Sequence, residues 1–389
     1  MTSTKIDLKS AAKKYVMYIA FAVIVIVFQI WTDGVLLVPQ NVTNLIQQNS
    51  YILILAVGML LCIIAGGHID LSVGSVAALV GALSAKLCIN GNASPALAIV
   101  MSLALGLVAG AITGYLVAYL NIASFIVTLA GQLIYRGLTL VILAGRTLSP
   151  FPEGYQLIST GFIPDFFNVP GIHMTSVVIG ILICPIILFV QIKGRREKIA
   201  HHTQVPKLPV FIVQQLLICG AVVFLAYWLA LFEGIPAVLV LLLVLIGIFS
   251  FVTNQTVMGR HFYAMGGNAK AAALSGVKTK LLLFLAFVNM GVLSALAGIV
   301  FSGRLNAATP KAGTEFAMDA ISACYIGGAS SSGGIGTVGG AIVGGLIMGV
   351  LNNGMSILGI NVDWQQVIKG VVLLLAVLFD TYSKNKVKK

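Results

Sequence analysis

Apolar runs separated by short polar stretches recur along the whole chain. The runs are about 20 residues long, enough for an α-helix to cross the hydrocarbon core of a bilayer. Helices are expected because lipid cannot satisfy exposed backbone polar groups, and the alternating pattern of membrane β-barrels is absent. Eight runs predict membrane-spanning helices, at residues 15–31, 96–120, 124–144, 174–193, 210–231, 236–253, 281–302 and 364–380.

Two further apolar stretches, 51–89 and 320–357, are interrupted by glycine clusters. The charges around them place both ends of each stretch on the outer side, so each must enter the membrane and return, as a hairpin or as a broken, re-entrant element. The sequence therefore predicts an all-α polytopic membrane protein of about ten membrane units. Paired interrupted helices in the two halves of a transporter indicate a site near the midplane. The alternative is that these glycines only allow close helix packing, as in GGAIVGGLIMG at 339–349.

Charge adds a prediction of orientation. The chain of 389 residues is 59% hydrophobic and 9% charged, with a net charge of +12. Seventeen of the 23 Lys and Arg residues lie in four polar segments, at 1–14, 193–207, 254–280 and 384–389. Basic residues stay cytoplasmic. We therefore expect cytoplasmic tails at 1–14 and 381–389 and cytoplasmic loops at 193–209 and 254–280, and no binding of nucleic acid.

No polar stretch exceeds about 30 residues, which is too short for an independent core, so residues 1–389 are expected to form one transmembrane domain. The sequence contains no phosphate loop, no H-E-x-x-H, no paired cysteine motif and no nucleophile elbow. We therefore predict no catalytic residues, no metal site and no cofactor held by this chain. The five cysteines are expected to be small buried hydrophobic residues.

Few ionisable residues fall inside the predicted spans. Asp70 and Arg136 are the deep candidates, whereas Lys86 and Lys369 lie near span ends, where lysines commonly extend their amine to the membrane surface. Ion-driven transport normally requires ionisable groups within the spans. Their scarcity favours a carrier whose energy comes from another protein.

The loop at 254–280 contains NAKAAALSG, which predicts a short helix that ends at Ser275 and Gly276. Lying between two spans, this helix has no lipid to cover its apolar side. It would offer Ala271, Ala272 and Leu274 to a groove of another protein. An ordinary loop is an equal alternative on these residues alone.

Four motifs carry a resemblance to a known family. GGNAKAAALSGV resembles the ATPase-coupling loop of the membrane permease subunits of bacterial ABC importers for monosaccharides, the ribose, xylose and galactoside type. AGGHIDLSVGS, ASFIVTLAGQLIYRGLTL and GGASSSGGIGTVGGAIVGG resemble three further signatures of this family, in the same order, over residues 35–380. The GGNAKAA form and the basic segment at 193–209 are most similar to multiple-monosaccharide importer permeases. Ala269 stands where the family often has Glu, and His68 is an addition to its turn.

This resemblance implies a non-enzymatic permease subunit in the bacterial inner membrane, paired with a second copy, with both termini cytoplasmic. An ABC ATPase subunit, which holds ATP and Mg²⁺, would bind at the inner face. A periplasmic sugar-binding protein would dock outside on the acidic loops 145–173 and 303–319. An ion-coupled sugar carrier or channel that needs no ATPase is the alternative. The sequence does not identify the sugar.

The resemblance also implies two sets of functional residues. The ATPase-coupling loop would comprise Gly266, Gly267, Asn268, Lys270, Ala272, Ala273, Ser275 and Gly276. The broken helix and the translocation path would comprise Gly67, His68, Asp70, Ser72, Gly74, Thr128, Gln132, Asn352 and Asn353. Asp70 has two compatible roles, as a cap of the helix that follows or as a contact for sugar. Asn289 is a further path candidate, with a helix–helix hydrogen bond as its alternative.

Overall fold

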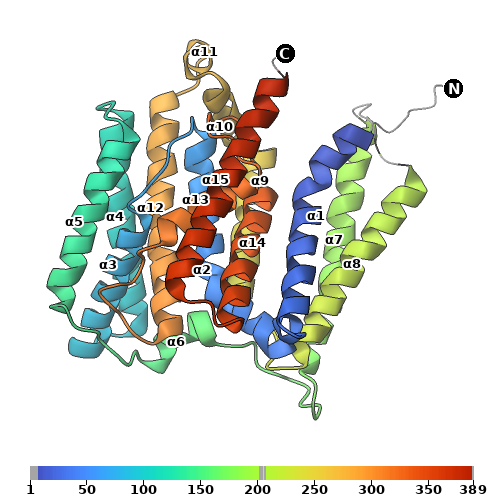
Figure 1. The fold of residues 1–389 in the computed structure, drawn as a ribbon, viewed down its shortest axis with the longest axis horizontal. Helices are drawn as coiled ribbons and strands as arrows, with labels where there is room; N and C mark the ends of the chain where they lie inside the picture. The colour runs from blue at the N-terminus through green and yellow to red at the C-terminus, as the bar shows by residue number, and fades with distance from the viewer. Residues whose placement is uncertain (1–7, 201–204, 206, 388–389) are drawn as a thin grey trace.

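The computed structural model describes residues 8–200, 205 and 207–387 and is a bundle of roughly parallel helices (Figure 1). The helices are α1 (Leu8–Trp31), α2 (Pro39–Ile64), α3 (Val73–Ala85), α4 (Pro95–Ala118), α5 (Ser124–Leu143), α6 (Glu153–Thr160), α7 (Met174–Ala200), α8 (Leu208–Ala230), α9 (Ala237–Gln255), α10 (Val257–Gly267), α11 (Ala269–Leu274), α12 (Thr279–Leu305), α13 (Phe316–Ile326), α14 (Val338–Ile357) and α15 (Val362–Val387). Two single turns, η1 (Val35–Leu37) and η2 (Lys86–Asn90), complete the set. No β-strand occurs within the described ranges.

The all-α polytopic fold is confirmed. In the described part of the chain, nine helices are long and apolar enough to cross a membrane. The first described turn of α1, the short helix α11 and the last turns of α15 lie at one end of the molecule (Figure 1). The placement of that end in the cytoplasm stays a prediction.

The two glycine-broken stretches differ from one another. The first is a pair of helices, α2 and α3 with η2, joined by residues 65–72, and both helices are long enough to span a membrane. The second joins α13, which has 11 residues, to α14, which has 20, through residues 327–337. Whether α13 enters and leaves on one side of a membrane stays a prediction.

Two predicted boundaries were wrong. Helix α2 begins at Pro39, twelve residues before the start of the predicted stretch 51–89. Four polar side chains in the added turns are buried, those of Thr43, Gln47, Asn49 and Ser50, and average hydropathy does not register such burial. Helix α7 continues to Ala200, so the predicted loop 193–209 starts about two turns later than expected.

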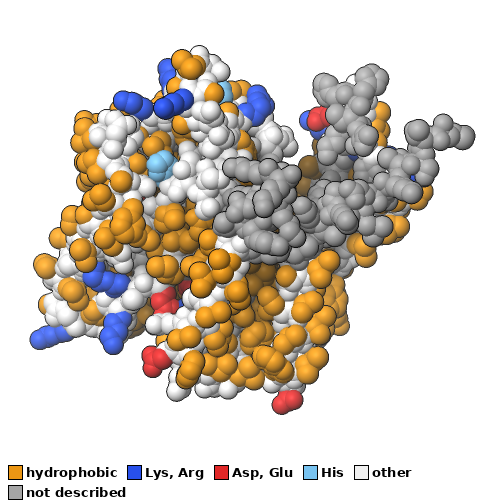
Figure 2. Space-filling model, turned by 45° about the horizontal axis from the view of Figure 1, so that its top comes forward, with side chains coloured by type: hydrophobic (Ala, Val, Ile, Leu, Met, Phe, Trp, Pro, Cys, Tyr) orange, Lys and Arg blue, Asp and Glu red, His pale blue; other side chains and the backbone are white. Residues whose placement is uncertain are grey.

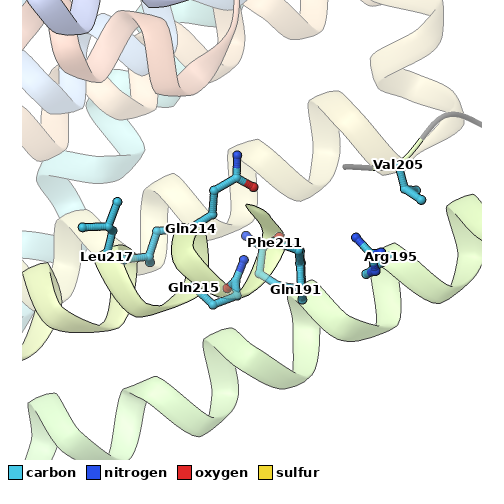
Figure 3. Close-up of a pocket in the computed structure, with 9 residues that line it drawn as sticks. Gln191, Arg195, Val205, Phe211, Gln214, Gln215 and Leu217 are labelled. Atoms are coloured by element: carbon cyan, nitrogen blue, oxygen red, sulfur yellow. The ribbon is translucent and has the colours of Figure 1, made fainter. Parts of the chain in front are cut away.

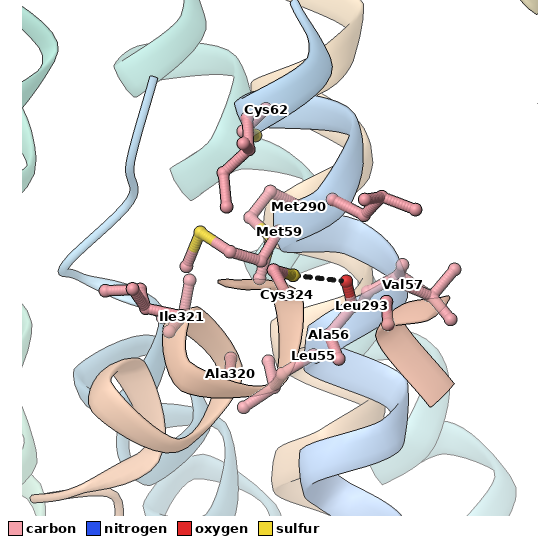
Figure 4. Close-up of a cluster of buried hydrophobic side chains, with 14 of the residues drawn as sticks. Leu55, Ala56, Val57, Met59, Cys62, Met290, Leu293, Ala320, Ile321 and Cys324 are labelled. Carbon is pink, nitrogen blue, oxygen red and sulfur yellow. Dashed lines mark hydrogen bonds between the residues drawn. The ribbon is translucent and has the colours of Figure 1, made fainter. Parts of the chain in front are cut away.

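The core is built around α2 and depends on small residues. Cβ atoms on Gly110 or Gly291 would collide with backbone atoms where α4 meets α12, and one on Gly344 would collide with Ala323 where α14 meets α13. Such contacts let helix backbones approach closely. Sulfur atoms also join helices, since the Cys324 thiol donates to the Ala56 carbonyl at 3.3 Å (Figure 4).

Helices α7 and α8 lie apart from this core. They stand together with α1 on one side of the molecule (Figure 1), and most of their side chains face outward. In the space-filling view, Lys and Arg side chains gather at the upper end and again at the lower left, with hydrophobic side chains between them (Figure 2). This pattern is typical of a membrane-embedded surface.

Candidate functional site

Three glycine pairs meet where the end of α10 contacts the two glycine-broken stretches. Gly66 and Gly67 follow α2, Gly266 and Gly267 end α10, and Gly333 and Gly334 lie between α13 and α14. The Gly334 N–H donates to the Ile64 carbonyl at 3.0 Å. A Cβ on Gly266 would collide with the backbone of both Ile64 and Gly334. The backbone of the 254–280 segment is therefore in direct contact with the backbones of both broken stretches.

A side chain strengthens this junction. Tyr263, one turn before Gly266 on α10, donates its hydroxyl hydrogen to the Gly336 carbonyl at 2.8 Å. A Cβ on Gly67 would collide with the Ser331 carbonyl, so the two broken stretches also touch one another directly. We name this set, residues 64–67, 263–267 and 331–336, the glycine junction.

The predicted short helix of the coupling loop is confirmed as α11. Asn268 caps it, since its Oδ1 accepts from the Ala271 N–H at 3.0 Å, and Gly276 follows with a left-handed φ of 87°. Leu274 is 91% exposed at the tip. Ala272, predicted to face a partner, is buried against this chain's own core, because its side of the short helix faces α10 and α12, whereas Ala271 is exposed as predicted.

The outward set on this loop is therefore smaller than predicted. Of the predicted coupling residues, those exposed are Gly267, Asn268, Lys270, Ala273, Ser275 and Gly276. With Leu274 they form a small convex tip at one end of the molecule (Figure 1).

The broken turn before α3 is organised by Asp70. Its Oδ1 accepts from the Ser72 N–H at 2.8 Å and from the Ser72 hydroxyl at 2.6 Å, and the residue is 3% exposed. These bonds close an Asx-type turn just before α3 and do not cap the helix, because its N-cap residue is Ser72 and no side-chain cap bond is present there. Two residues further on, Gly74 packs against the backbone of Gly313.

His68 connects the same turn to α5. Its Nδ1 lies 3.2 Å from the Ser124 hydroxyl oxygen, and its ring meets Phe287 edge-on, with centroids 6.2 Å apart. The imidazole is half-buried and fixes the turn between α5 and α12. This contact accounts for a histidine that the sequence left unexplained.

Helix α5 packs along the turn. A Cβ on Gly131 would lie 3.3 Å from the Ser72 Cβ. Thr128, fully buried, and Gln132, half-buried, flank that contact on the same helix. The structure thus groups the predicted path residues of α5 with those of the broken turn.

Asn352 and Asn353 do not belong to this group. Asn353 exchanges two hydrogen bonds with Asn41, at 2.9 and 3.2 Å, in the first turn of α2. Gly67 follows the last turn of α2, which is about 35 Å away along that helix. The predicted path residues therefore fall into two separate groups, and Asn353 joins two helices.

A buried ionic cluster was not anticipated. The Lys369 amine on α15 pairs with Glu315 and lies 3.3 Å from Asp319 Oδ1, and the Tyr51 hydroxyl donates to Asp319 Oδ2 at 3.2 Å. Lys369 therefore pairs within the protein instead of reaching the membrane surface. Asp319 is 2% exposed, which removes it from the predicted external docking surface. The sequence did carry a signal for this cluster, namely the spacing of four residues between Glu315 and Asp319 and the presence of Lys369 inside a predicted span.

Arg136, a deep candidate in the sequence, holds the chain that leads into α13. Its Nη1 donates to the carbonyls of Pro310 and Ala312 at 2.9 and 2.7 Å, and its Nη2 donates to the Thr314 hydroxyl at 3.2 Å. These bonds tie α5 to the loop that contacts Gly74. Asp70 and Arg136, the ionisable residues near the broken segments, thus hold neighbouring parts of the backbone in place.

At the far end of the molecule, Asp165 is held by Thr175. Hydrogen bonds from the Thr175 hydroxyl at 2.6 Å and from its N–H at 3.1 Å keep the pKa of this carboxyl below its ordinary value. Asp165 therefore remains a negative charge on the 145–173 loop.

We expect Asp70→Ala to lower the stability of the purified protein by roughly 1–2 kcal/mol, because the Ser72 N–H and hydroxyl, both buried in the turn before α3, lose their acceptor. Thermal unfolding in detergent measures this loss. Asp70→Asn is the matched control, since it keeps an oxygen acceptor and should unfold close to wild type. An Ala variant as stable as wild type would contradict the role of Asp70 in holding this turn.

Taken together, these features define a polytopic membrane protein in which a loop at one end contacts both glycine-broken stretches. No group of three or more His, Cys, Asp or Glu suited to a metal ion occurs among the described residues. The family described as branched-chain amino acid transport system / permease component matches residues 41–377, and the chain belongs to this family.

Individual relatives cover nearly the whole chain. The xylose transport system permease protein XylH of Haemophilus influenzae is 39% identical over 375 residues, which is 96% of this chain and 97% of the relative. The ribose import permease protein RbsC is 35% identical in Escherichia coli, covering 87% of this chain and 85% of the relative. RbsC of Bacillus subtilis is 32% identical, covering 97% and 95%. No solved structure matches.

Proposed function

We propose that this chain is the membrane permease subunit of an ABC importer for a monosaccharide. The names of its xylose and ribose permease relatives support this class of substrate. The chain would provide the path through the membrane, and ATP hydrolysis would take place on a separate subunit that holds ATP and Mg²⁺.

The glycine junction is the observation that carries the mechanism. An ATPase subunit would bind the tip formed by α10 and α11, where Leu274 projects. Because Gly266 lies against the backbones of Ile64 and Gly334, movement of α10 must displace both broken stretches or be resisted by them. Close-packed interiors transmit such displacements. A push on the tip would thereby change the path beside Asp70 and α5.

The path itself needs no fixed charge for a neutral sugar. His68 and Ser72 in the turn before α3, with Thr128 and Gln132 on α5, would offer hydrogen-bonding groups, and Asp70 holds that turn. A second copy of this chain would complete the path. A periplasmic binding protein would deliver the sugar at the end where Asp165 lies.

On this proposal the chain would lie in the bacterial inner membrane with both termini in the cytoplasm. This placement accords with the α11 end of the molecule, which carries the positive segments of the sequence. The particular sugar would be selected largely by the binding protein.

An ion-coupled sugar carrier is a second candidate, favoured by one observation. Glu315, Asp319 and Lys369 form an ionisable cluster on helices α13 and α15, and such groups within membrane helices often carry ions or protons. The cluster is internally paired, which favours a structural role.

A transport assay in liposomes separates the two functions. We expect the purified chain alone to take up neither radiolabelled D-xylose nor D-ribose under an imposed proton or sodium gradient. Addition of its ATPase, its binding protein and ATP should give uptake of the cognate sugar. Gradient-driven uptake by the chain alone would overturn the proposal in favour of the carrier.

A further inference from the structure

A hollow lies between α7 and α8 at the end of the molecule that also bears α11. Its volume is about 460 Å³, and Figure 3 shows Gln191 and Arg195 of α7 beside Phe211 and Gln215 of α8. Its lining is formed by Gln191, Gly194, Arg195, Val205, Phe211, Gln214, Gln215, Leu217 and Ile218. None of these residues belongs to the glycine junction or to the predicted path.

The hollow is lined by one positively charged side chain and by one buried amide oxygen that lacks a hydrogen-bond donor. Arg195 places its guanidinium carbon 4.9 Å from the centre of the Phe211 ring, within the lining. Gln215 is 7% exposed, and its Oε1 has no hydrogen-bond partner among the described residues. A buried amide oxygen without a donor is unfavourable, so this atom indicates a missing hydrogen-bond donor.

The surroundings of the hollow are those of a membrane surface. Phe189, Leu216 and Leu217, on the two helices that form it, are 68–70% exposed, as expected for side chains that face lipid tails. Arg196 and Lys207 add positive charge at the same end. A polar, positively charged recess between two lipid-facing helices is suited to a lipid headgroup.

We propose that this hollow binds the headgroup of an anionic phospholipid of the phosphatidylglycerol type. Its phosphate would pair with the Arg195 guanidinium, and a headgroup hydroxyl would donate to Gln215 Oε1. The acyl chains would follow Leu217 and Ile218 into the bilayer. Such a lipid would join α7 to α8, a pair that has little other support from the core.

The test measures how ligands shift the melting temperature of the full-length protein in detergent. The probes are dioctanoyl phosphatidylglycerol, dioctanoyl phosphatidylcholine and inorganic phosphate, each titrated separately. We expect phosphatidylglycerol to raise the melting temperature, phosphatidylcholine to raise it less, and inorganic phosphate to leave it unchanged. The free anion has no apolar chains to occupy the hollow.

Arg195→Gln and Arg196→Gln form a matched pair, because both remove one positive charge but only Arg195 lines the hollow. Arg195→Gln should bind phosphatidylglycerol roughly fivefold more weakly, whereas Arg196→Gln should bind like wild type. Gln215→Glu is a second variant, in which the added carboxylate should repel the phosphate and weaken binding at least as much.

Three results would overturn the proposal. They are equal phosphatidylglycerol binding by wild type and Arg195→Gln, equal shifts with phosphatidylglycerol and phosphatidylcholine, and an equal shift with inorganic phosphate, which would make the hollow a simple anion site. If Arg195→Gln is not monodisperse on gel filtration, Gln215→Glu decides the question. Wild-type affinity in that variant contradicts the assignment.

Discussion

Gly266→Ala is expected to lower the melting temperature of the protein and to abolish sugar uptake by the assembled importer. The added methyl group would meet the backbones of Ile64 and Gly334, which cannot rotate away as a side chain could. Overpacking of this kind costs roughly 2–3 kcal/mol. Unfolding in detergent reports the stability, and uptake of the cognate sugar by the reconstituted complex reports function.

Gly267→Ala is the matched control for this variant. Gly267, the next residue along α10, is exposed and has an ordinary helical backbone, and a Cβ atom added to it would meet no heavy atom within 4 Å. This variant should unfold at the wild-type temperature. Equal melting temperatures for the two alanine variants would show that the glycine junction is not closely packed. If Gly266→Ala is destabilised but fully active, the junction is closely packed but does not pass movement of α10 to the broken stretches.

Lys369→Met is the second substitution with a large expected effect. It leaves the Asp319 carboxylate, which is 2% exposed, without its cation, while Glu315 also loses its partner. Removing one partner of a buried ion pair costs about 3–5 kcal/mol. We expect a loss of folded protein after extraction, measured by gel filtration and thermal unfolding.

A double variant tests the cause of this loss. Lys369→Met combined with Asp319→Asn removes the uncompensated buried charge and should recover most of the stability. Lys311→Met, at an exposed lysine just before α13, controls for the loss of a positive charge and should behave like wild type. If Asp319→Asn gives no recovery, the destabilisation arises from lost packing of the lysine stem and not from electrostatics.

Much of the local organisation could be predicted because it depends on short-range pattern. The runs of apolar residues located the long helices, and NAKAAALSG located α11 with its glycine end. The start of α2 was missed because its polar residues are buried by α14 and other helices, a contact between segments about 300 positions apart (Asn41 with Asn353). Likewise, Ala272 of α11 is buried because it packs against core residues of other helices, which the sequence of the loop does not reveal.

The sequence by itself determined that this protein is a helical membrane protein with two glycine-broken stretches and one protruding loop. It did so because hydropathy, charge and glycine act locally on which segments enter lipid and where helices end. Only the tertiary structure decided that Gly266 meets both broken stretches, and that Lys369 meets Asp319. Those contacts join residues remote along the chain, and they follow from the three-dimensional fit of helices that no local pattern specifies.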